Sequence, residues 1–364
     1  MSSSAAGHAS LRDLGWDESL DLELAARAAG LEPARVSRVD RGAADLLGRS
    51  GPVRATYGRD VLAAIADDRT ALPTVGDWAA LATWPDGRTT IETLLPRRTQ
   101  VVRDGADRTS HGQVLAANVD LVVIVEHLEP DPDLGRIERL LVLAWGSGAQ
   151  PLVVLTKTDL VPDPNGMVAQ VSSAVPGAEV LGVSAATGDG LDAVQAHLAP
   201  GRTLVLLGPS GAGKSTLTNA LAGAELMATR GLRADGRGRH TTTHRELVAL
   251  PGVGVVLDTP GLRSVGVVGD TDAMRDAFPE IAELAAECRF RDCAHETEPG
   301  CAVLAAVEDG ALDERRLASW RKLGREAAYQ ARRTDARLRA AELAVWKRRH
   351  KAMRERYKHQ PRKR

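Results

Sequence analysis

The chain has 364 residues, a length that allows two or three domains. Hydrophobic residues make up 43% of the sequence and charged residues 26%, which excludes a wholly disordered chain and a fibrous repeat. The formal net charge is −1. The charge-free stretch 140–156 is interrupted by glycine, serine, glutamine and proline, so we expect no membrane-spanning helix. The N-terminus has no basic region followed by an apolar one, so we expect a cytoplasmic protein without a secretory signal.

The N-terminal part predicts a helical extension followed by a small barrel. Residues 1–33 form the extension, whose role the sequence does not reveal. The segment 34–100 contains short runs such as PVRATYG, DVLAAIA, GDWAALATW and RTTIETLLP, and five short strands here predict a barrel of the OB-fold type. Such a barrel binds nucleic acid or serves as a structural or partner-binding module, and both remain open. Arg97, Arg98 and Arg103 in the linker that follows either contact phosphate or are solvated.

A motif for base recognition comes next. The apolar run 151–159 ends in Thr156-Lys157-Thr158-Asp159, which resembles the guanine-recognition motif Asn-Lys-x-Asp. A carboxylate accepts hydrogen bonds from guanine N1–H and the 2-amino group, which adenine lacks, and the lysine stem covers the base. Thr156 departs from the usual asparagine and keeps only a hydroxyl to bond the neighbouring loops. A loop that merely caps a strand gives the same pattern, so this motif does not decide the matter alone.

The strongest motif is a phosphate-binding loop. Before it, Ser184 and Ala185 follow a short apolar run and match the base-side loop of GTPases. Residues 208–215, GPSGAGKS, then fit G-x-x-x-x-G-K-[ST] between an apolar strand and a segment with helical spacing. The glycines let backbone N–H groups surround phosphates at a helix N-terminus. Lys214 should reach the β- and γ-phosphates, and the Ser215 hydroxyl should ligate Mg²⁺.

Two further segments predict the switches of a GTPase. Residues 228–243 are rich in Gly and Arg and end in His240 and three threonines, one of which closes on Mg²⁺. Another apolar run ends in Asp258-Thr-Pro-Gly261, where Asp258 holds Mg²⁺ through water and the Gly261 N–H senses the γ-phosphate. Leu262 occupies the position of the water-orienting glutamine of many GTPases, so we predict slow intrinsic turnover and assign the catalytic role to His240. His240 can instead stabilise the loop or touch RNA.

The order of these motifs predicts a circularly permuted GTPase. In a standard GTPase the phosphate loop comes first and the base motif late, whereas here the base motif and Ser-Ala loop precede the phosphate loop. The chain therefore enters the domain, residues 112–282, at the fold's fourth strand, 120–125. The second switch leads directly into the C-terminal module, so nucleotide state can be passed to it.

The C-terminal segment 283–364 predicts a zinc-binding helical domain. All three cysteines lie within fourteen residues and, with one histidine, give the ligand set of a closed structural Zn²⁺ site: Cys288, Cys293, His295 and Cys301. Beyond them, residues 331–364 contain fourteen Lys or Arg against three acidic residues. A basic tail on an acidic body favours a polyanionic partner, most simply nucleic acid, although a solvated helix has the same composition.

From about residue 35 onwards, the sequence resembles the ribosome small-subunit-dependent GTPases (RsgA, also called YjeQ or EngC). The resemblance rests on the permuted motifs and on LLPRRTQVVR before AANVDLVVIV, GRGRHTTTHREL, DTPGLRS and CRFRDCAHETEPGCAV. It implies an OB-fold, a permuted GTPase and a zinc-containing C-terminal domain. It also implies a cytoplasmic monomer that binds the 30S subunit and its 16S rRNA late in maturation and hydrolyses GTP to GDP and phosphate when the subunit stimulates it.

The resemblance also implies the residues that contact GTP. These are Thr156, Lys157, Thr158, Asp159, Gly208, Pro209, Ser210, Gly211, Ala212, Gly213, Lys214, Ser215 and Thr216. Thr156 and the N-terminal extension are the departures from the family pattern. The alternative function is a nucleotide-regulated RNA-binding scaffold in which hydrolysis is incidental. An ATP-dependent kinase or ATPase would account for the phosphate loop but not for the base motif or the Ser-Ala loop.

Overall fold

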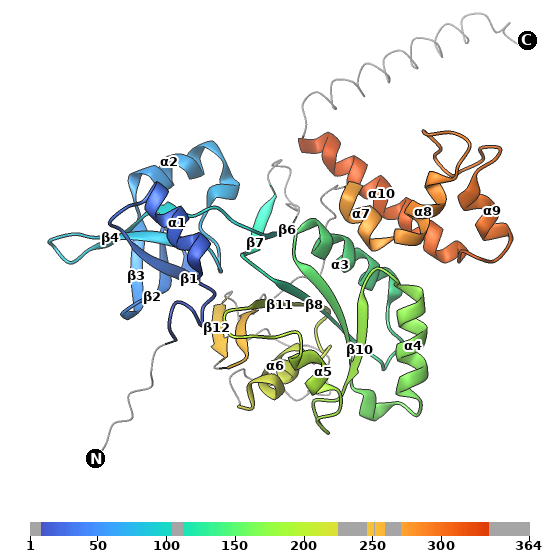
Figure 1. Cartoon of the computed structure of the whole chain (residues 1–364), viewed down its shortest axis with the longest axis horizontal. Helices are drawn as coiled ribbons and strands as arrows, with labels where there is room; N and C mark the ends of the chain where they lie inside the picture. Colours follow the sequence, from blue (N-terminus) through green and yellow to red (C-terminus); the bar gives the residue numbers. More distant parts are fainter. Residues whose placement is uncertain (1–8, 104–111, 225–245, 251, 259–270, 335–364) are drawn as a thin grey trace, which may run out of the picture.

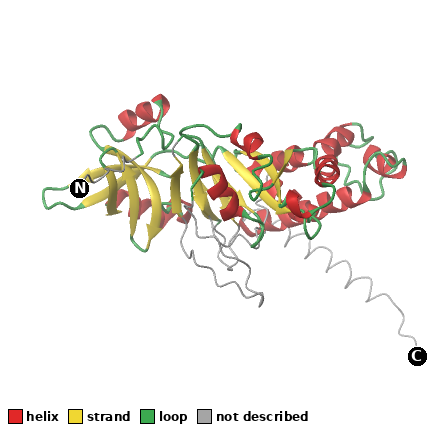
Figure 2. Ribbon diagram, turned by 90° about the horizontal axis from the view of Figure 1, so that it is seen from below, coloured by secondary structure: helices red, strands yellow, loops and turns green. Residues whose placement is uncertain are grey.

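The structure is a computed structural model that describes residues 9–103, 112–224, 246–250, 252–258 and 271–334. Figure 1 shows three parts in a row: a small barrel, a central sheet with helices, and a group of helices at the C-terminal end. Figure 2 shows the barrel and the sheet side by side with the C-terminal helices beyond the sheet. Within the described ranges, no helix has the length and apolar character needed to cross a bilayer.

The N-terminal segment forms one helix, α1 (Glu18–Arg27). Asp17 caps it, because its carboxylate accepts hydrogen bonds from the N–H groups of Ser19 and Leu20. Leu14, Trp16 and Leu20 are buried in the core shared with the central sheet. The extension is therefore packed into the fold.

The barrel is closed, with strand order β1-β2-β3-β5-β4. Its strands are β1 (Glu32–Asp40), β2 (Ala43–Gly48), β3 (Gly51–Tyr57), β4 (Trp78–Thr83) and β5 (Thr89–Leu94). Small and branched side chains from alternate strand positions fill the interior, among them Ala34, Val36, Leu46 and Ile91. The predicted five-stranded barrel is confirmed.

One run within the barrel was predicted wrongly. The sequence DVLAAIA was interpreted as a strand, but it lies in helix α2 (Arg59–Asp67), which the short 3₁₀ helix η1 (Arg69–Ala71) follows. Val61 is buried and Ile65 packs against the same core, so the apolar face repeats every four residues. Alanine has the highest helix propensity, and three alanines in the run favour the helix over a strand.

The central sheet has the strand order β10-β9-β8-β11-β13-β12. All neighbours are parallel except β12, which pairs antiparallel with β13 at the edge. The strands are β8 (Leu121–His127), β9 (Gln150–Thr156), β10 (Glu179–Val183), β11 (Thr203–Leu207), β12 (Glu246–Leu250) and β13 (Gly254–Asp258). A separate ribbon, β6 (Gln100–Arg103) and β7 (Gln113–Ala117), joins the barrel to this sheet.

Both faces of the central sheet are covered, which explains its almost continuous apolar strands. Alternate residues of β8 illustrate this, since Val122 and Ile124 enter one core while Leu121 and Val123 enter the other. The connecting helices are α3 (Leu134–Gly146), η2 (Thr158–Leu160), α4 (Pro164–Ala174), α5 (Leu191–Gln195) and α6 (Lys214–Ala222). The sheet begins at β8, as the permuted motif order predicts.

After β13, the described residues form four helices: α7 (Thr271–Ala277), which precedes the C-terminal module, and then α8 (Pro279–Ala286), α9 (Ala302–Glu308) and α10 (Glu314–Thr334). Helix α7 packs against α3 of the central domain, and α8 packs against α9. Phe278 is fully buried between α7 and α8. Figure 1 shows α10 running along the module from its outer loops back towards α3.

A buried arginine joins the extension, the barrel and the central domain. The Arg35 guanidinium is 1% exposed and donates hydrogen bonds to the main-chain oxygens of Leu14, Gly76 (3.3 Å) and Asn118 (3.1 Å). It also lies 5.2 Å from the ring centre of Trp78. Burial lowers the pKa of Arg35 to about 10, so the group is still charged at neutral pH.

Two contacts of the extension reinforce this junction. The Trp16 ring meets the Trp78 ring edge to face at 4.9 Å between centroids. At the rim, Arg98 donates to both carboxylate oxygens of Asp17, each at 2.6 Å. The neighbouring Arg97 pairs with the buried Asp77 at 2.7 Å. Arg97 and Arg98 are therefore both engaged in ion pairs within the fold, which the sequence did not indicate, whereas the Arg103 side chain lies outside the described residues.

Candidate nucleotide-binding site and metal cluster

The phosphate loop lies between β11 and α6, in the strand–loop–helix arrangement that the motif predicts. Its three glycines have positive φ angles, 148° at Gly208, 86° at Gly211 and 89° at Gly213. A Cβ atom at Gly208 would lie 2.0 Å from the carbonyl oxygen of Val125, so only glycine fits there. No side chain caps α6 at Gly213, which leaves its first-turn N–H groups for an anion.

Lys214 folds back over the phosphate loop. Its Nζ donates hydrogen bonds to the carbonyl oxygens of Gly208 (2.9 Å) and Pro209 (2.7 Å). Ser215 follows it on the first turn of α6 and is partly exposed. The ammonium group and the hydroxyl therefore lie at the mouth of the loop, where phosphates and their metal ion are bound in this type of site.

Thr156 links the base motif to the phosphate loop. Its buried hydroxyl lies 2.7 Å from the carbonyl oxygen of Ala212 and 3.2 Å from that of Glu126. A hydroxyl has one proton to donate, and the shorter distance assigns it to Ala212. The threonine thus connects the two loops across 56 residues of sequence, although it has lost the amide of the usual asparagine.

The base motif also meets the Ser-Ala loop. Ser184 is fully buried, and its hydroxyl donates to the Asp159 carboxylate at 2.6 Å. The N–H of Thr187 donates to the same hydroxyl oxygen at 3.2 Å, so Ser184 is fixed from both sides. The serine orients the carboxylate, and Asp159 itself is exposed in η2, three residues after the end of β9. Lys157 precedes it in the left-handed region with φ of 61°, and Thr158 and Ala185 belong to the same two loops.

Several predicted residues lie outside the described part of the chain. They are His240 with the three threonines after it, Gly261 and Leu262. Asp258 is the last residue of β13, which pairs with β11 in parallel register, so its backbone lies at the edge of the sheet from which the phosphate loop departs.

Sequence analysis missed one carboxylate near this edge. Glu126 is 1% exposed at the end of β8, and Arg136 of α3 donates to it at 2.7 Å. The same residue offers its carbonyl oxygen to Thr156. A glutamate at the end of the otherwise apolar run DLVVIV is the signal that identifies it, because an acidic side chain in a buried strand requires a partner.

The three cysteines and one histidine of the C-terminal module form a compact cluster. Their four ligand atoms all lie within 4.8 Å of one another. Cys288 Sγ is 3.8 Å from Cys301 Sγ and 3.5 Å from His295 Nδ1, which is 3.4 Å from Cys301 Sγ. Tetrahedral Zn²⁺ with its usual bond lengths places ligand sulfurs about 3.8 Å apart. The donor set and the spacing therefore fit zinc.

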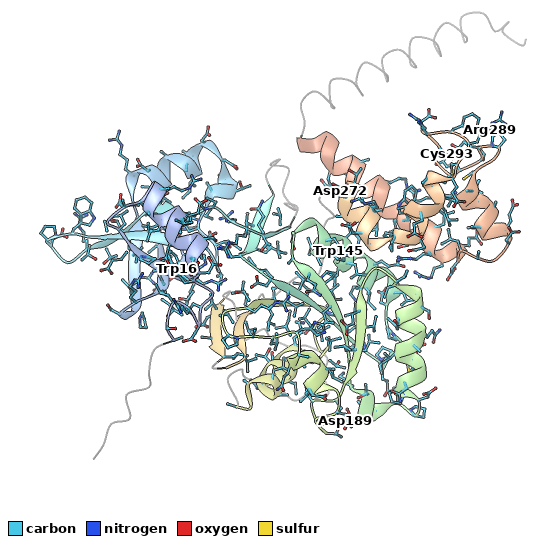
Figure 3. All side chains as sticks on the ribbon, viewed as in Figure 1. Trp16, Trp145, Asp189, Asp272, Arg289 and Cys293 are labelled. Carbon is cyan, nitrogen blue, oxygen red and sulfur yellow. The ribbon has the colours of Figure 1, made fainter. Side chains whose placement is uncertain are left out.

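The surroundings of the cluster hold the histidine in place. Arg321 of α10 donates to the main-chain oxygen of His295, and the Trp320 ring packs against the imidazole edge at 5.5 Å. Burial lowers the pKa of His295, which favours the neutral imidazole that binds metals. Figure 3 shows Cys293 at the end of the module away from the central sheet, so the cluster is separate from the phosphate loop.

The fold and these contacts define a P-loop GTPase in which the base-recognition loops precede the phosphate loop. A scan for protein families matches residues 94–268 to the RsgA GTPase family. The chain is 53% identical over 352 residues to the small ribosomal subunit biogenesis GTPase RsgA of Streptomyces coelicolor, covering 95% of this chain and 94% of the relative. It is 37% identical to the protein of that name from Methanosarcina acetivorans, covering 90% and 88%.

Two solved structures are similar as well. YjeQ from Thermotoga maritima has 25% identity and a TM-score of 0.59, covering 81% of this chain and 98% of that chain. YloQ, described as a circularly permuted GTPase, has 25% identity and a TM-score of 0.57, covering 83% and 96%. The chain belongs to the RsgA family of small ribosomal subunit biogenesis GTPases. The predicted family, the permuted fold and the GTPase activity are thereby confirmed.

Proposed function

We propose that this GTPase hydrolyses GTP to GDP and phosphate when the 30S subunit stimulates it, and that it acts late in the maturation of that subunit. The observation that carries the proposal is the pair of hydrogen bonds from Thr156 to Ala212 and from Ser184 to Asp159, which gather the base and phosphate loops at one edge of the sheet. The names of the similar proteins support the small subunit as the partner.

In the proposed GTP site, different residues contact the base and the phosphates. Asp159 accepts from the guanine edge, the Lys157 stem covers the base, and the Lys214 ammonium neutralises β- and γ-phosphate charge. The remaining contacts come from Thr156, Thr158, Ser184, Ala185, Gly208, Pro209, Ser210, Gly211, Ala212, Gly213, Ser215, Thr216, Asp258 and Gly261. Mg²⁺ supplies charge neutralisation at the phosphates when bound, with Ser215 as a ligand and Asp258 holding a water ligand.

For the C-terminal module, we propose one structural Zn²⁺ held by Cys288, Cys293, His295 and Cys301. All four positions of a tetrahedral ion are then filled by protein atoms, which is the pattern of a structural site. The module, residues 283–364, would act with the barrel, residues 34–100, in contacting 16S rRNA around the GTPase domain, residues 112–282. Together they make a cytoplasmic, monomeric factor.

Catalysis is assigned to His240. Leu262 follows the D-x-x-G motif and has no polar group to orient the attacking water, so the imidazole takes that role when the 30S subunit is bound. The test is turnover titrated with purified 30S subunits. We expect His240→Ala to keep GTP binding and 30S association and to lose roughly a hundredfold in stimulated turnover. Wild-type protein that binds 30S without stimulation would instead favour the RNA-binding scaffold.

Base choice provides a second test. Asp159→Asn replaces an acceptor with a group that suits the xanthine edge, so GTP affinity should fall and xanthosine triphosphate affinity should rise. Asp192→Asn, at an exposed position on α5, is the matched control and should leave both affinities unchanged. An Asp159→Asn variant with full GTP preference would show that another residue recognises the base.

A further inference from the structure

One arginine of α10 holds the junction between the GTPase and the C-terminal module. Arg316 is 3% exposed, and its guanidinium donates hydrogen bonds in three directions. Nε reaches the Glu280 carboxylate of α8 at 2.6 Å, one terminal nitrogen reaches Glu138 of α3 at 3.0 Å, and the other reaches the main-chain oxygen of Ala277 at 2.7 Å. Below it, the ring centre of Phe278 lies 4.0 Å away.

Two of these contacts fix the carboxyl end of α7. Ala277 is the last residue of that helix, so its carbonyl oxygen is one of the groups without a partner inside the helix. A cation at this end also interacts favourably with the helix dipole. Phe278 follows directly and is fully buried under the guanidinium. Any movement of the end of α7 therefore displaces two contacts of Arg316 at once.

The remaining contacts tie α10 to a second element. Glu138 of α3 is fully buried and accepts hydrogen bonds from Arg315, Arg316 and Ser319. Near the middle of α10, Glu326 forms a bidentate pair with Arg139 of α3. Helix α10 is thus anchored on α3 at two places, while Arg316 also contacts the end of α7.

Residues of the same helix, α10, also contact the metal cluster. Trp320 and Arg321 lie one turn beyond Arg316, and they contact the His295 ring and its main-chain oxygen. Trp320 and Arg321, which hold the cluster, therefore lie only four and five positions after Arg316, which holds α7. A helix is stiff over this length, so a shift at one point is carried to the other.

We infer that Arg316 is a positioning residue through which the position of α7 is passed to the Cys₃His module. This rests on the proposed function, because it concerns how the module responds to GTP. In GTPases the γ-phosphate orders the segment after the D-x-x-G motif, and α7 is the first described helix after that motif. Arg316 connects that helix to α10 and so couples nucleotide state to the surface that the module presents.

The inference is tested with Arg316→Lys in the full-length, zinc-loaded protein. Lysine keeps the positive charge but lacks the planar fork that reaches three acceptors. The control is Arg325→Lys, an exposed position on the same helix. Zinc content and unfolding midpoint establish that each variant is folded. The readouts are hydrogen exchange of residues 287–301 with GDP and with a non-hydrolysable GTP analogue, and the ratio of 30S affinities in the two nucleotide states.

In the wild type and in Arg325→Lys, exchange at 287–301 should differ between the two nucleotides. In Arg316→Lys the difference should disappear, and the ratio of 30S affinities should fall about tenfold towards one, while intrinsic turnover stays within about twofold. Nucleotide-dependent exchange that persists in the variant would overturn the inference, as would its absence from the wild type. If wild type shows the exchange difference but no 30S stimulation, only the proposed function fails.

Should Arg316→Lys not fold, Glu280→Gln replaces it. Glu280 is partly exposed, and the amide keeps one acceptor for Arg316 without the charge. The exchange difference should then be reduced. An unaltered difference in folded Glu280→Gln would likewise overturn the inference.

Discussion

The two domain junctions are each built around a buried arginine, but the groups that receive its hydrogen bonds differ. Arg35 donates to three main-chain oxygens and lies against Trp78. Arg316 donates to two carboxylates and one main-chain oxygen and lies against Phe278. Main-chain oxygens move only with their backbone, whereas carboxylates can change rotamer and partner. The hydrogen bonds of Arg35 therefore fix the first junction in one arrangement, whereas the carboxylate partners of Arg316 allow the second junction to rearrange.

The largest loss of unfolding free energy is expected at Arg35, whose acceptors are main-chain oxygens that cannot change rotamer. Arg35→Met keeps the length of the apolar stem but removes the guanidinium donors from the main-chain oxygens of Leu14, Gly76 and Asn118, of which Gly76 still accepts from the Asn118 side chain. Each such loss costs about 1–3 kcal/mol, and we expect a destabilisation of about 4 kcal/mol in urea unfolding. Arg38→Met, further along the same strand and partly exposed, should cost less than about 1 kcal/mol. Equal effects of the two substitutions would show that Arg35 does not hold the junction.

A smaller effect is expected at the carboxylate junction. Glu138→Gln removes a buried charge that three side chains contact, yet Arg316 retains Glu280 and the Ala277 oxygen. We expect a loss of about 2 kcal/mol in unfolding free energy, less than the 3–5 kcal/mol typical when a buried charge loses its only partner. The exposed Glu283→Gln on α8 serves as the control. A cost above that of Arg35→Met would reverse the comparison.

The smallest effect concerns the ion pairs at the rim of each junction. Hydrogen bonds from Arg98 hold the pKa of Asp17 well below its usual range, and Arg139 lowers the pKa of Glu326. A carboxyl group with a lowered folded pKa stabilises the fold above its unfolded pKa of about 4, and this contribution is lost as pH falls through the folded value.

Because these side chains are partly exposed, each pair should contribute at most about 1 kcal/mol at neutral pH. Asp17→Asn and Glu326→Gln should therefore lower the unfolding free energy slightly at pH 7 and by less at pH 2, and added salt should reduce the difference at pH 7. Thermal unfolding at the two pH values measures it. A variant that differs from wild type equally at both pH values would show that the pair acts by packing rather than by charge.

The phosphate loop, the sheet strands and the metal cluster were predictable because each rests on local pattern. The glycines of the loop permit one backbone path, and runs such as LVVIV fit only a strand buried on both faces. Likewise, three cysteines and a histidine at short spacing specify a ligand set without knowledge of the rest of the fold.

The junctions were not predictable, because their partners lie far apart in sequence. Arg35 alternates with Ala34 and Val36 on β1, so a period of two places it on the face away from the barrel interior. That face is buried because residues 11–20 of the extension cover it together with Trp78 and Asn118. Glu138 and Arg316 are likewise 178 residues apart; Glu138 lies in a mostly apolar helix and Arg316 in a strongly charged one, and neither local pattern indicates that the two side chains pair. The helical spacing of the apolar residues in DVLAAIA is also a local pattern. The alternating strand pattern of the neighbouring runs nevertheless favoured the wrong prediction of a strand.

The Arg35 junction has a consequence for synthesis of the chain. Its acceptors lie 21, 41 and 83 residues away, so the last of them, Asn118, leaves the ribosome long after Leu14 and Trp16. At about 5–20 residues per second, roughly 100 residues take about 5–20 s. During that time the apolar side chains of the extension have only part of their final packing partners. The first segment to be synthesised is thus among the last to reach its final packing, because part of its junction is supplied by residues that leave the ribosome much later.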